Sequence, residues 1–562
     1  MRDKHTIKIG VEYRYSSNLD KYSPSAGGSF TFNNVATGSA LAGLELGWVD
    51  QASLLATYPL PSRADSYAAF IQDDWRVSPR LTLNYGLRWD IDEPRWVENN
   101  RQNSFNETEI NPVSGTPGVV TFSGIGGVSK YASNWDLHNF GPRLGFAYKA
   151  STNWVIRGGG AILYLGEYDQ ATPIVANLGF STQGSFVSPN NGVTPAFLLG
   201  QGMPAVSSPT VAQLTAGYGA VPAGTKPTTA VTFFNTNRSN GYIYQSSLDI
   251  QRQFAGNLML DLGYLGSFGH KMPAPDAQSI DQVPTNLLGP GNTQVLRPFP
   301  QFSNVQVIAA DIGASKYNGL NIGLEKRYSQ GLLFKFNYTY SHMMDNIDSR
   351  NERAAFPGVD AFTNYYNQAN DWGNSGNDIR HRVVFSAIYE LPVGRGRRFT
   401  INSRPLDFVA GGWSIGAVAT ARTGTPLSPV VANNTTNSFS DSERPNVVGN
   451  WQLSGSRTTG QQIAEWFNTA AFAAPAPYVF GDAGRTFGVG PGMANIDASL
   501  LKDFKVTERI AVQFRAEALN VLNHPSFANP NTTFGSAAFG QITSLIAGNQ
   551  SRILQLGLHL SF

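Results

Sequence analysis

The chain has 562 residues, with 41 Lys and Arg against 39 Asp and Glu, so its formal net charge is only +2. This balance argues against a nucleic-acid-binding protein, which usually carries a marked basic excess. The absence of Cys excludes disulfide frameworks, thiolate metal sites and cysteine nucleophiles.

From its first residues onward, the chain alternates apolar and polar side chains with a period of two, as β-strands do. Clear examples are "TIKIGVEYRY" (6–15), "RLTLNYGLRWDI" (80–91), "LLFKFNYTYSH" (332–342) and "RIAVQFRAEALN" (509–520). We count about fifteen such segments, each roughly 9–14 residues long. Soluble strands average only ~5–6 residues, whereas tilted strands that cross a bilayer need about 9–11. No stretch approaches the ~20 apolar residues of a transmembrane helix.

Charged residues fall on the polar face of these strands. Arg88 with Asp90, Lys335, and Arg515 with Glu517 lie in mid-strand. A wide, water-filled lumen accommodates such charges. A soluble sandwich would equally present them to bulk water, so this pattern alone leaves both architectures open. If the apolar face meets lipid, Leu83→Arg or Phe336→Arg should cost about 2–4 kcal/mol near the midplane.

The connections alternate between short and long. Short ones lie at 76–82, 149–154, 254–257, 328–332 and 503–510. Long ones lie near 92–140, 165–242, 269–313, 343–379, 423–492 and 521–549. Short periplasmic turns and long extracellular loops are typical of outer-membrane barrels. The fold class predicted is therefore all-β: a large, antiparallel transmembrane β-barrel of the outer membrane.

Two regions fit this scheme poorly. The link 392–410, which contains the basic turn "GRGRR", lies on the short-turn rim but is longer than the others. The region 16–64 cannot be placed, because "GSFTFNN" is too short to assign as a spanning strand.

Amphipathic helices are scarce, and the best candidate is a short turn near "TGQQIAEWFN" (459–468).

The chain ends in "SRILQLGLHLSF", with alternate Leu residues and a terminal Phe on one face. A sheet in lipid cannot leave an open edge, so this strand is expected to pair with the first strand of the barrel. Leu558, Leu560 and Phe562 also resemble the terminal signature that the barrel-insertion machinery recognises. The alternative is a chance terminal Phe, which the preceding alternating Leu residues disfavour.

Several longer segments carry a family resemblance. "YAAFIQDDWRVSPRLTLNYGLRWDI" (67–91) resembles a strand pair that is widespread in TonB-dependent receptors. The segments 377–399, 465–475, 481–506 and 515–530 are similar to the Oar-like branch of that family. The resemblance implies a signal peptide, a plug domain moved by TonB, and a large barrel through which a bound ligand is imported.

This sequence departs from that pattern at its start. It opens inside a strand, "HTIKIGVEYRY", without the apolar segment of a signal peptide, a TonB box or a plug. We therefore expect residues 1–562 to be the barrel domain of a longer receptor, with the earlier strands, the plug and the signal peptide missing. A smaller, independent barrel sized like a porin is the other possibility.

The sequence shows no catalytic motif, no spaced His pair for a metal and no nucleotide-binding loop, so we expect neither an enzyme nor a cofactor. The aromatic residues Tyr365, Tyr366 and Trp372 could contact a ligand from a long loop, or pack that loop onto itself. Asp378, Arg380 and Arg382 are predicted to form an ion-pair cluster at the rim of the barrel.

These observations lead to one preferred function and two alternatives. We expect a transporter or receptor barrel in the bacterial outer membrane, with lipid, the insertion machinery, TonB (through the plug) and an unknown ligand as partners, and no nucleic acid. The alternatives are a passive porin-like channel and a surface-exposed β-rich binding or adhesion protein. Detergent dependence would separate a soluble protein from the other two.

Overall fold

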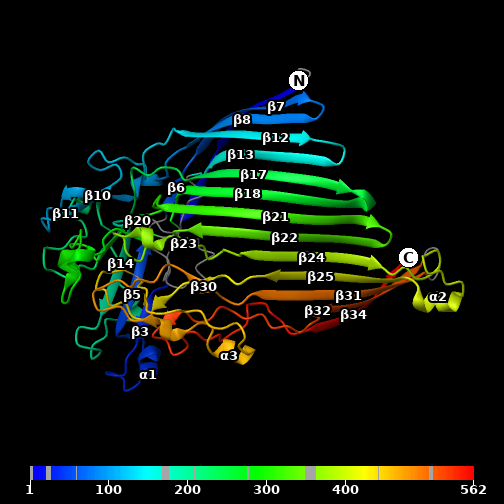
Figure 1. Ribbon diagram of the computed structural model, residues 1–562. Helices are drawn as coiled ribbons and strands as arrows, with labels where there is room; N and C mark the ends of the chain where they lie inside the picture. The colour runs from blue at the N-terminus through cyan, green and yellow to red at the C-terminus, as the bar shows by residue number, and fades with distance from the viewer. Residues whose placement is uncertain are drawn as a thin grey trace.

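The computed structural model describes residues 4–20, 27–57, 60–166, 176–207, 209–274, 277–347, 362–440, 442–505 and 510–562. Its main feature is a 15-stranded antiparallel sheet, here called the wall, in which long strands follow one another in chain order and the short β23 (Gly373–Asn374) pairs with β22 (Figure 1). The long wall strands are β1 (His5–Arg14), β7 (Ser66–Ser78), β8 (Leu81–Asp92), β12 (Asn139–Lys149), β13 (Trp154–Tyr164), β17 (Tyr242–Phe254), β18 (Leu258–Met272), β21 (Gly313–Ser329), β22 (Leu332–Asp345), β24 (His381–Glu390), β25 (Trp413–Arg422), β31 (Met493–Lys505), β32 (Ala511–Leu519) and β34 (Ile553–Ser561).

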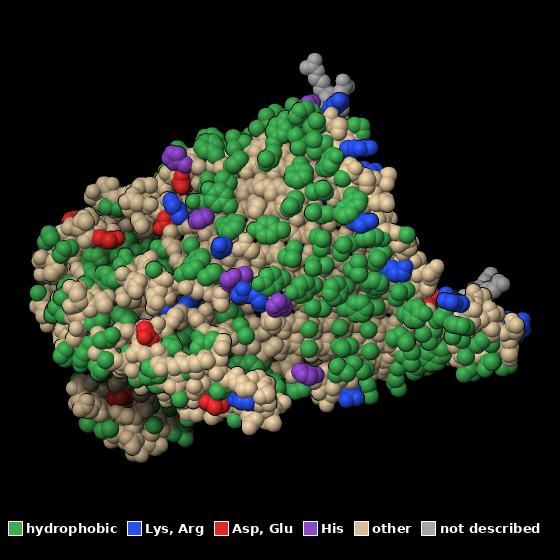
Figure 2. Space-filling model, in the orientation of Figure 1, with side chains coloured by type: hydrophobic (Ala, Val, Ile, Leu, Met, Phe, Trp, Pro, Cys, Tyr) green, Lys and Arg blue, Asp and Glu red, His purple; other side chains and the backbone are tan. Residues whose placement is uncertain are grey.

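The register of the wall confirms the predicted separation of apolar and polar faces. Phe336 on β22 lies opposite Leu324 on β21 and Phe385 on β24. The neighbouring Lys335 points to the other side, where it lies opposite Glu325. We call the apolar side the outer face and the charged side the inner face. Figure 2 shows hydrophobic side chains spread over the strands of the wall.

Aromatic side chains mark both ends of the outer face. Towards the long connections, Trp89 stacks on Phe140 with ring centroids 5.5 Å apart. Towards the short turns, the Arg252 guanidinium lies 4.8 Å from the centroid of the Trp154 ring. Amphipathic aromatic belts of this kind are typical of the two membrane–water interfaces of a barrel.

The connections are distributed as predicted. The short turns lie at one end of the wall, together with both chain termini, and the long connections gather at the other end (Figure 1). Residues 506–509 of the predicted turn 503–510 lie outside the described residues. The unusual link 392–410 contains α2 (Arg404–Ala410), which lies at the short-turn end.

α-Helices are few and short in the described part of the chain. Besides α2 they are α1 (Ala40–Glu45) and α3 (Thr459–Ala464). α3 is the turn expected from the sequence, and a reciprocal capping box between Thr458 and Gln461 begins it. None of the helices described has the length and apolar character that a membrane crossing requires.

The long connections fold into a structure of their own, here called the loop layer, comprising residues 15–65, 93–138, 165–241, 273–312, 346–380, 423–492 and 520–552 as far as they are described. Small sheets join connections that are distant in the sequence, and the region 16–64, unplaced from sequence, supplies several of their strands. The strands of the loop layer are β2 (Ser17–Asp20), β3 (Ser29–Thr31), β4 (Trp48–Val49), β5 (Gln51–Thr57), β6 (Leu60–Arg63), β9 (Trp96–Val97), β10 (Asn103–Ile110), β11 (Pro117–Phe122), β14 (Ser181–Val187), β15 (Phe197–Leu198), β16 (Ala230–Phe234), β19 (Gln278–Ser279), β20 (Asn304–Ile308), β26 (Pro426–Leu427), β27 (Val430–Val431), β28 (Asn446–Val447), β29 (Phe472–Ala473), β30 (Phe487–Val489) and β33 (Thr533–Phe534).

The buried core of the molecule lies in the loop layer. Phe105 packs edge-on against Phe299 and Phe302, with centroids 5.1 and 5.8 Å away, and tilted against Phe233. All four are buried and belong to one apolar cluster. The wall contributes little to this core, because its apolar side chains point outward.

The wall is open at both edges among the described residues. β1 pairs only with β7, and β34 pairs only with β32. The predicted pairing of the terminal strand with the first strand of the barrel is therefore not made in this part of the chain. An unpaired strand edge is costly in lipid, because its N–H and C=O groups find no water there.

Candidate functional site

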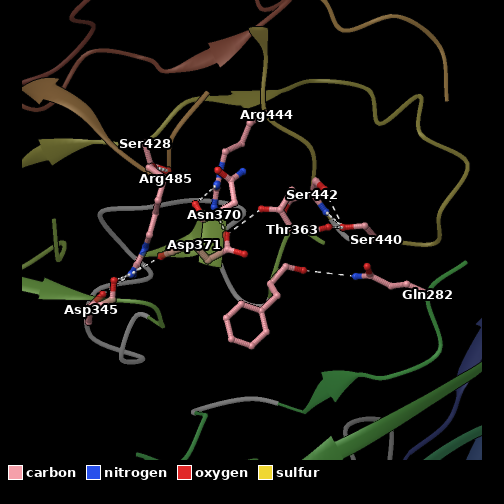
Figure 3. Close-up of polar contacts among 11 residues, drawn as sticks. Gln282, Asp345, Thr363, Asn370, Asp371, Ser428, Ser440, Ser442, Arg444 and Arg485 are labelled. Carbon is pink, nitrogen blue, oxygen red and sulfur yellow. Dashed lines mark hydrogen bonds and ion pairs between the residues drawn. The ribbon is translucent and has the colours of Figure 1, made fainter. Parts of the chain in front are cut away.

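Buried ion pairs hold the connections of the loop layer together. Arg485, from the 423–492 connection, pairs with the Asp345 carboxylate at the end of β22. Its Nη1 also donates to the main-chain oxygens of Asp345 and Asp371, at 2.5 and 3.3 Å. Ser428 Oγ donates to the carbonyl of Arg485 at 2.8 Å (Figure 3). The Arg485 side chain is only 1% exposed, so its charge depends on these partners.

A second pair lies beside the first. Arg444 pairs with the Asp371 carboxylate, and both side chains are 2% exposed. Arg444 Nη1 donates to the carbonyl of Asn370 at 3.0 Å, and Thr363 Oγ1 donates to Asp371 Oδ1 at 3.3 Å. Figure 3 shows these groups converging from two connections. Together the two pairs fasten the 423–492 connection to the end of β22 and to the 346–380 connection.

A third pair belongs to the 273–312 connection. Arg297 Nη2 lies 2.8 Å from Asp281 Oδ2, and both side chains are almost fully buried. The amide of Phe299 donates to Asp281 Oδ1 at 2.9 Å. Burial nevertheless dominates and raises the pKa of Asp281 to about 7.

The aromatic residues predicted as ligand contacts lie between two connections. The Tyr366 hydroxyl donates to the carbonyl of Gln282, and the Tyr365 amide donates to Gln282 Oε1, both at 2.9 Å. Burial raises the pKa of both tyrosines. Trp372 is 39% exposed and Tyr366 is 44% exposed. The Tyr365 amide and the Tyr366 hydroxyl are thus occupied by contacts within the loop layer. The exposed parts of the Tyr366 and Trp372 side chains present a surface that a ligand could reach.

The predicted rim cluster is brought together only in part. Asp378, which is 4% exposed, pairs with Arg380 at 2.9 Å and accepts the amide of Met343 at 2.8 Å. Arg382 lies on β24 directly opposite Arg422, and it makes no ion pair among the described residues. Two like charges facing each other need water or a further anion, and the inner face of the wall provides access to water.

The inner face carries a separate charged group at the β1 edge. Arg88 Nε lies 2.7 Å from Asp90 Oδ1, and Arg88 Nη2 lies 3.0 Å from Glu12 Oε2. This charged group is only partly buried, because the Glu12 side chain is 42% exposed. This arrangement is suited to a hydrated interior rather than to a dry core.

The comparisons with known proteins agree with this geometry. A family model described as an outer membrane beta barrel domain matches residues 1–555. The chain belongs to this outer membrane β-barrel family. The comparison with curated proteins gives no match.

Three solved structures of outer-membrane proteins are similar to this chain. The outer membrane transporter YddB from Escherichia coli is 9% identical, with a TM-score of 0.50 over 99% of this chain and 51% of that one. The FrpB iron transporter from Neisseria meningitidis (F3-3 variant) is 11% identical, with a TM-score of 0.40 over 100% of this chain and 53% of that one. The ferric yersiniabactin uptake receptor FyuA from Yersinia pestis is 10% identical, with a TM-score of 0.37 over 91% and 47%.

The predicted fold class and outer-membrane location are therefore confirmed. Identities this low show the fold alone. The barrel chain spans about half the length of these transporters. Assignment to the Oar-like branch stays a prediction.

The terminal strand β34 presents its alternate Leu residues on the outer face, as the alternation predicts, but among the described strands it pairs only with β32. Leu558 and Leu560 on β34 lie opposite Phe514 and Val512 on the outer face, and they are 76% and 56% exposed. Phe562 is 96% exposed at the short-turn end. These positions leave the terminal residues accessible, and their recognition by the insertion machinery stays a prediction.

Sequence reasoning missed two features of the loop layer. The buried ion pairs join residues too far apart for any local pattern to reveal them. A surface cavity of about 280 Å³ also went unnoticed; it is lined in part by Trp451, Trp466, Arg457 and Gln462. The only available signal was the aromatic content of the segment that follows α3.

Proposed function

We propose that residues 1–562 form one receptor-like barrel domain of a TonB-dependent, Oar-like outer-membrane transporter, whose parent protein imports a bound ligand. The observation that carries this proposal is the open wall. β1 and β34 each leave one edge unpaired among the described residues. Such a wall needs further strands before it closes in lipid, and the transporters with a similar fold are about twice as long.

The inner face of the wall and the loop layer support the same role. The charged inner face, with Arg88 bound to Asp90 and Glu12, is suited to a wet lumen that holds a plug and passes a ligand. The loop layer offers exposed aromatic surface at Trp372 for ligand capture. Energy would come from TonB acting on the plug, and no step of this function requires an enzyme.

A passive porin is the less favoured function. A porin made from these strands alone would have to pair β1 with β34, and the described wall does not make that pairing. Its interior would also stay open, whereas a plugged transporter barrel conducts only when the plug moves. The two functions therefore differ in conductance as well as in architecture.

The test uses the protein as it occurs in the outer membrane. An antibody against the 423–492 connection would capture it from membrane extracts, and the product would be sized and inserted into planar bilayers. We expect a polypeptide larger than this chain, nearly silent in the bilayer, that conducts after denaturant loosens the plug. A product of this size with steady conductance would refute the transporter and establish a porin. A product that stays monodisperse without detergent would refute both.

A further inference from the structure

The connection between β24 and β25, residues 391–412, differs from the other turns at the short-turn end. It holds the basic turn "GRGRR" and the helix α2. In Figure 1 this connection projects beyond the wall, beside the C-terminus. Neither the fold nor the proposed transport function accounts for it.

α2 lies against the outer face of the wall. The Phe408 ring lies 5.0 Å from the ring of Phe504 on β31. Phe504 belongs to the outer face, because it lies opposite Val512, which in turn lies opposite Leu560. The Trp413 indole nitrogen donates to the carbonyl of Val409 at 2.9 Å and fixes the end of the helix. The helix therefore continues the surface that meets lipid.

Several apolar side chains of α2 remain exposed although the helix contacts the wall. Leu406 and Phe408 are each 56% exposed, and Val409 is 66% exposed. Phe399, just before the helix, is 60% exposed. Figure 2 shows hydrophobic side chains extending without a break from the wall onto this projection. Exposed apolar side chains next to a lipid-facing surface are typical of interfacial helices.

Basic residues surround these apolar side chains. A cavity of about 660 Å³ between the basic turn, α2 and the end of β31 is lined by Arg395, Arg397, Arg404 and Lys502, with Asp407 and Asp503. Arg397 is engaged with Glu390 at 2.6 Å, and Lys502 is turned toward the carbonyl of Gly411. Asp407 accepts the amide of Arg395 at 2.8 Å, and Arg395 Nη2 donates to the carbonyl of Asn402 at 3.5 Å, a contact that leaves the other guanidinium nitrogens for a phosphate. Arg404 has no ion pair among the described residues.

We propose that the 391–412 connection anchors the barrel to the inner leaflet of the outer membrane by binding anionic phospholipid. Leu406, Phe408 and Val409 enter the boundary of the acyl chains, and the guanidinium groups of Arg395 and Arg404 hold headgroup phosphates. Short turns mark the periplasmic side of such barrels, which places α2 at that leaflet. Two observations favour a lipid surface as the partner. The apolar surface of the connection continues that of the lipid-facing wall, and basic groups are in excess around it.

The test exploits the absence of Cys from residues 1–562. The full protein from outer membranes would carry Val409→Cys labelled with an environment-sensitive fluorophore, in nanodiscs of phosphatidylcholine alone or mixed equally with phosphatidylglycerol. Leu41→Cys is the matched control, because Leu41 is a 64% exposed helical residue in the loop layer. Nitroxide-bearing lipids in the nanodisc would report contact with the acyl boundary.

We expect severalfold stronger quenching at position 409 than at position 41, and a blue shift at 409 that grows with phosphatidylglycerol. The double variant Arg395→Gln/Arg404→Gln should lose the dependence on phosphatidylglycerol but keep the quenching. The control Lys226→Gln, at an exposed loop position, should lose neither. Equal quenching at 409 and 41 would overturn the anchor, and an unchanged lipid preference in the double variant would overturn the phosphate contacts.

Discussion

Replacing Phe336 with Arg would place a charge in the middle of the outer face. Phe336 lies four residues from Leu332 at the short turn and four from Tyr340 near the loop layer. At ~3.3 Å per residue, it is at most ~13 Å from each of these two positions, close to the centre of an apolar band ~25 Å tall. The free energy of unfolding should therefore fall by about 2–4 kcal/mol.

The structure separates this position from Leu83, for which the alternation alone predicts the same cost. Leu83 lies only two residues from the first residue of β8 at the short turn, so its side chain is nearer the interface. An Arg there can reach the headgroups, and the cost should drop towards ~1 kcal/mol. Phe336→Arg should therefore cost more than Leu83→Arg, because Phe336 lies deeper in the apolar band.

Unfolding of the full protein in phospholipid vesicles, followed by heat-dependent gel mobility over a denaturant series, would measure both changes. Asn337→Arg is the matched control, because it is the next residue on β22 and points to the inner face, opposite Gly323 and Val384. It should change the free energy by less than ~0.5 kcal/mol. If Asn337→Arg cost as much as Phe336→Arg, the assignment of the two faces would be wrong.

Three further predictions concern the loop layer. Arg485→Met should destabilise it by about 3–5 kcal/mol, because Asp345 is left buried without its partner, and limited proteolysis would show the loss. Gly481→Ala should cost about 1–3 kcal/mol by the same assay, because the added methyl group would clash with the carbonyl oxygen of Arg444. Burial raises the pKa of Asp281 to about 7, so the folded layer keeps a proton that the unfolded chain has lost. Its stability should fall as pH rises from about 4 to about 7 and then level off, as measured by hydrogen exchange corrected for intrinsic rates.

Each of these has its own control. Adding Asp345→Leu to Arg485→Met should restore most of the stability, and no recovery would mean that packing rather than charge explains the loss. Gly455→Ala, where a methyl group meets open space, should leave proteolysis unchanged. Asp281→Asn should abolish the pH slope, and a slope that persists would assign it to another group.

The wall could be predicted from the sequence because its signal is local. Alternation along 332–342 already distinguishes Phe336 from Lys335, and β22 has that register. The positions of the long and short connections follow from where the alternation stops. α2 was missed, although Ser403 and Pro405 at its start are ordinary signals for a helix N-terminus.

The loop layer could not be predicted in the same way. Several of its short strands pair with segments from other connections, as β5 does with β14, and periodicity is lost over so few residues. The partners in two of its buried ion pairs, Arg485 with Asp345 and Arg444 with Asp371, are also far apart in sequence. Tyr366 was identified as a loop aromatic, but only the structure shows that its hydroxyl is bound to Gln282.

The pairing of Arg485 with Asp345 has a consequence for the order of biogenesis. These residues stand 140 positions apart, and β24, β25 and the 391–412 connection lie between them. The pair can form only when the chain between its two members has folded back on itself. Closure of this part of the loop layer therefore depends on β24 and β25 having taken their places beside β22.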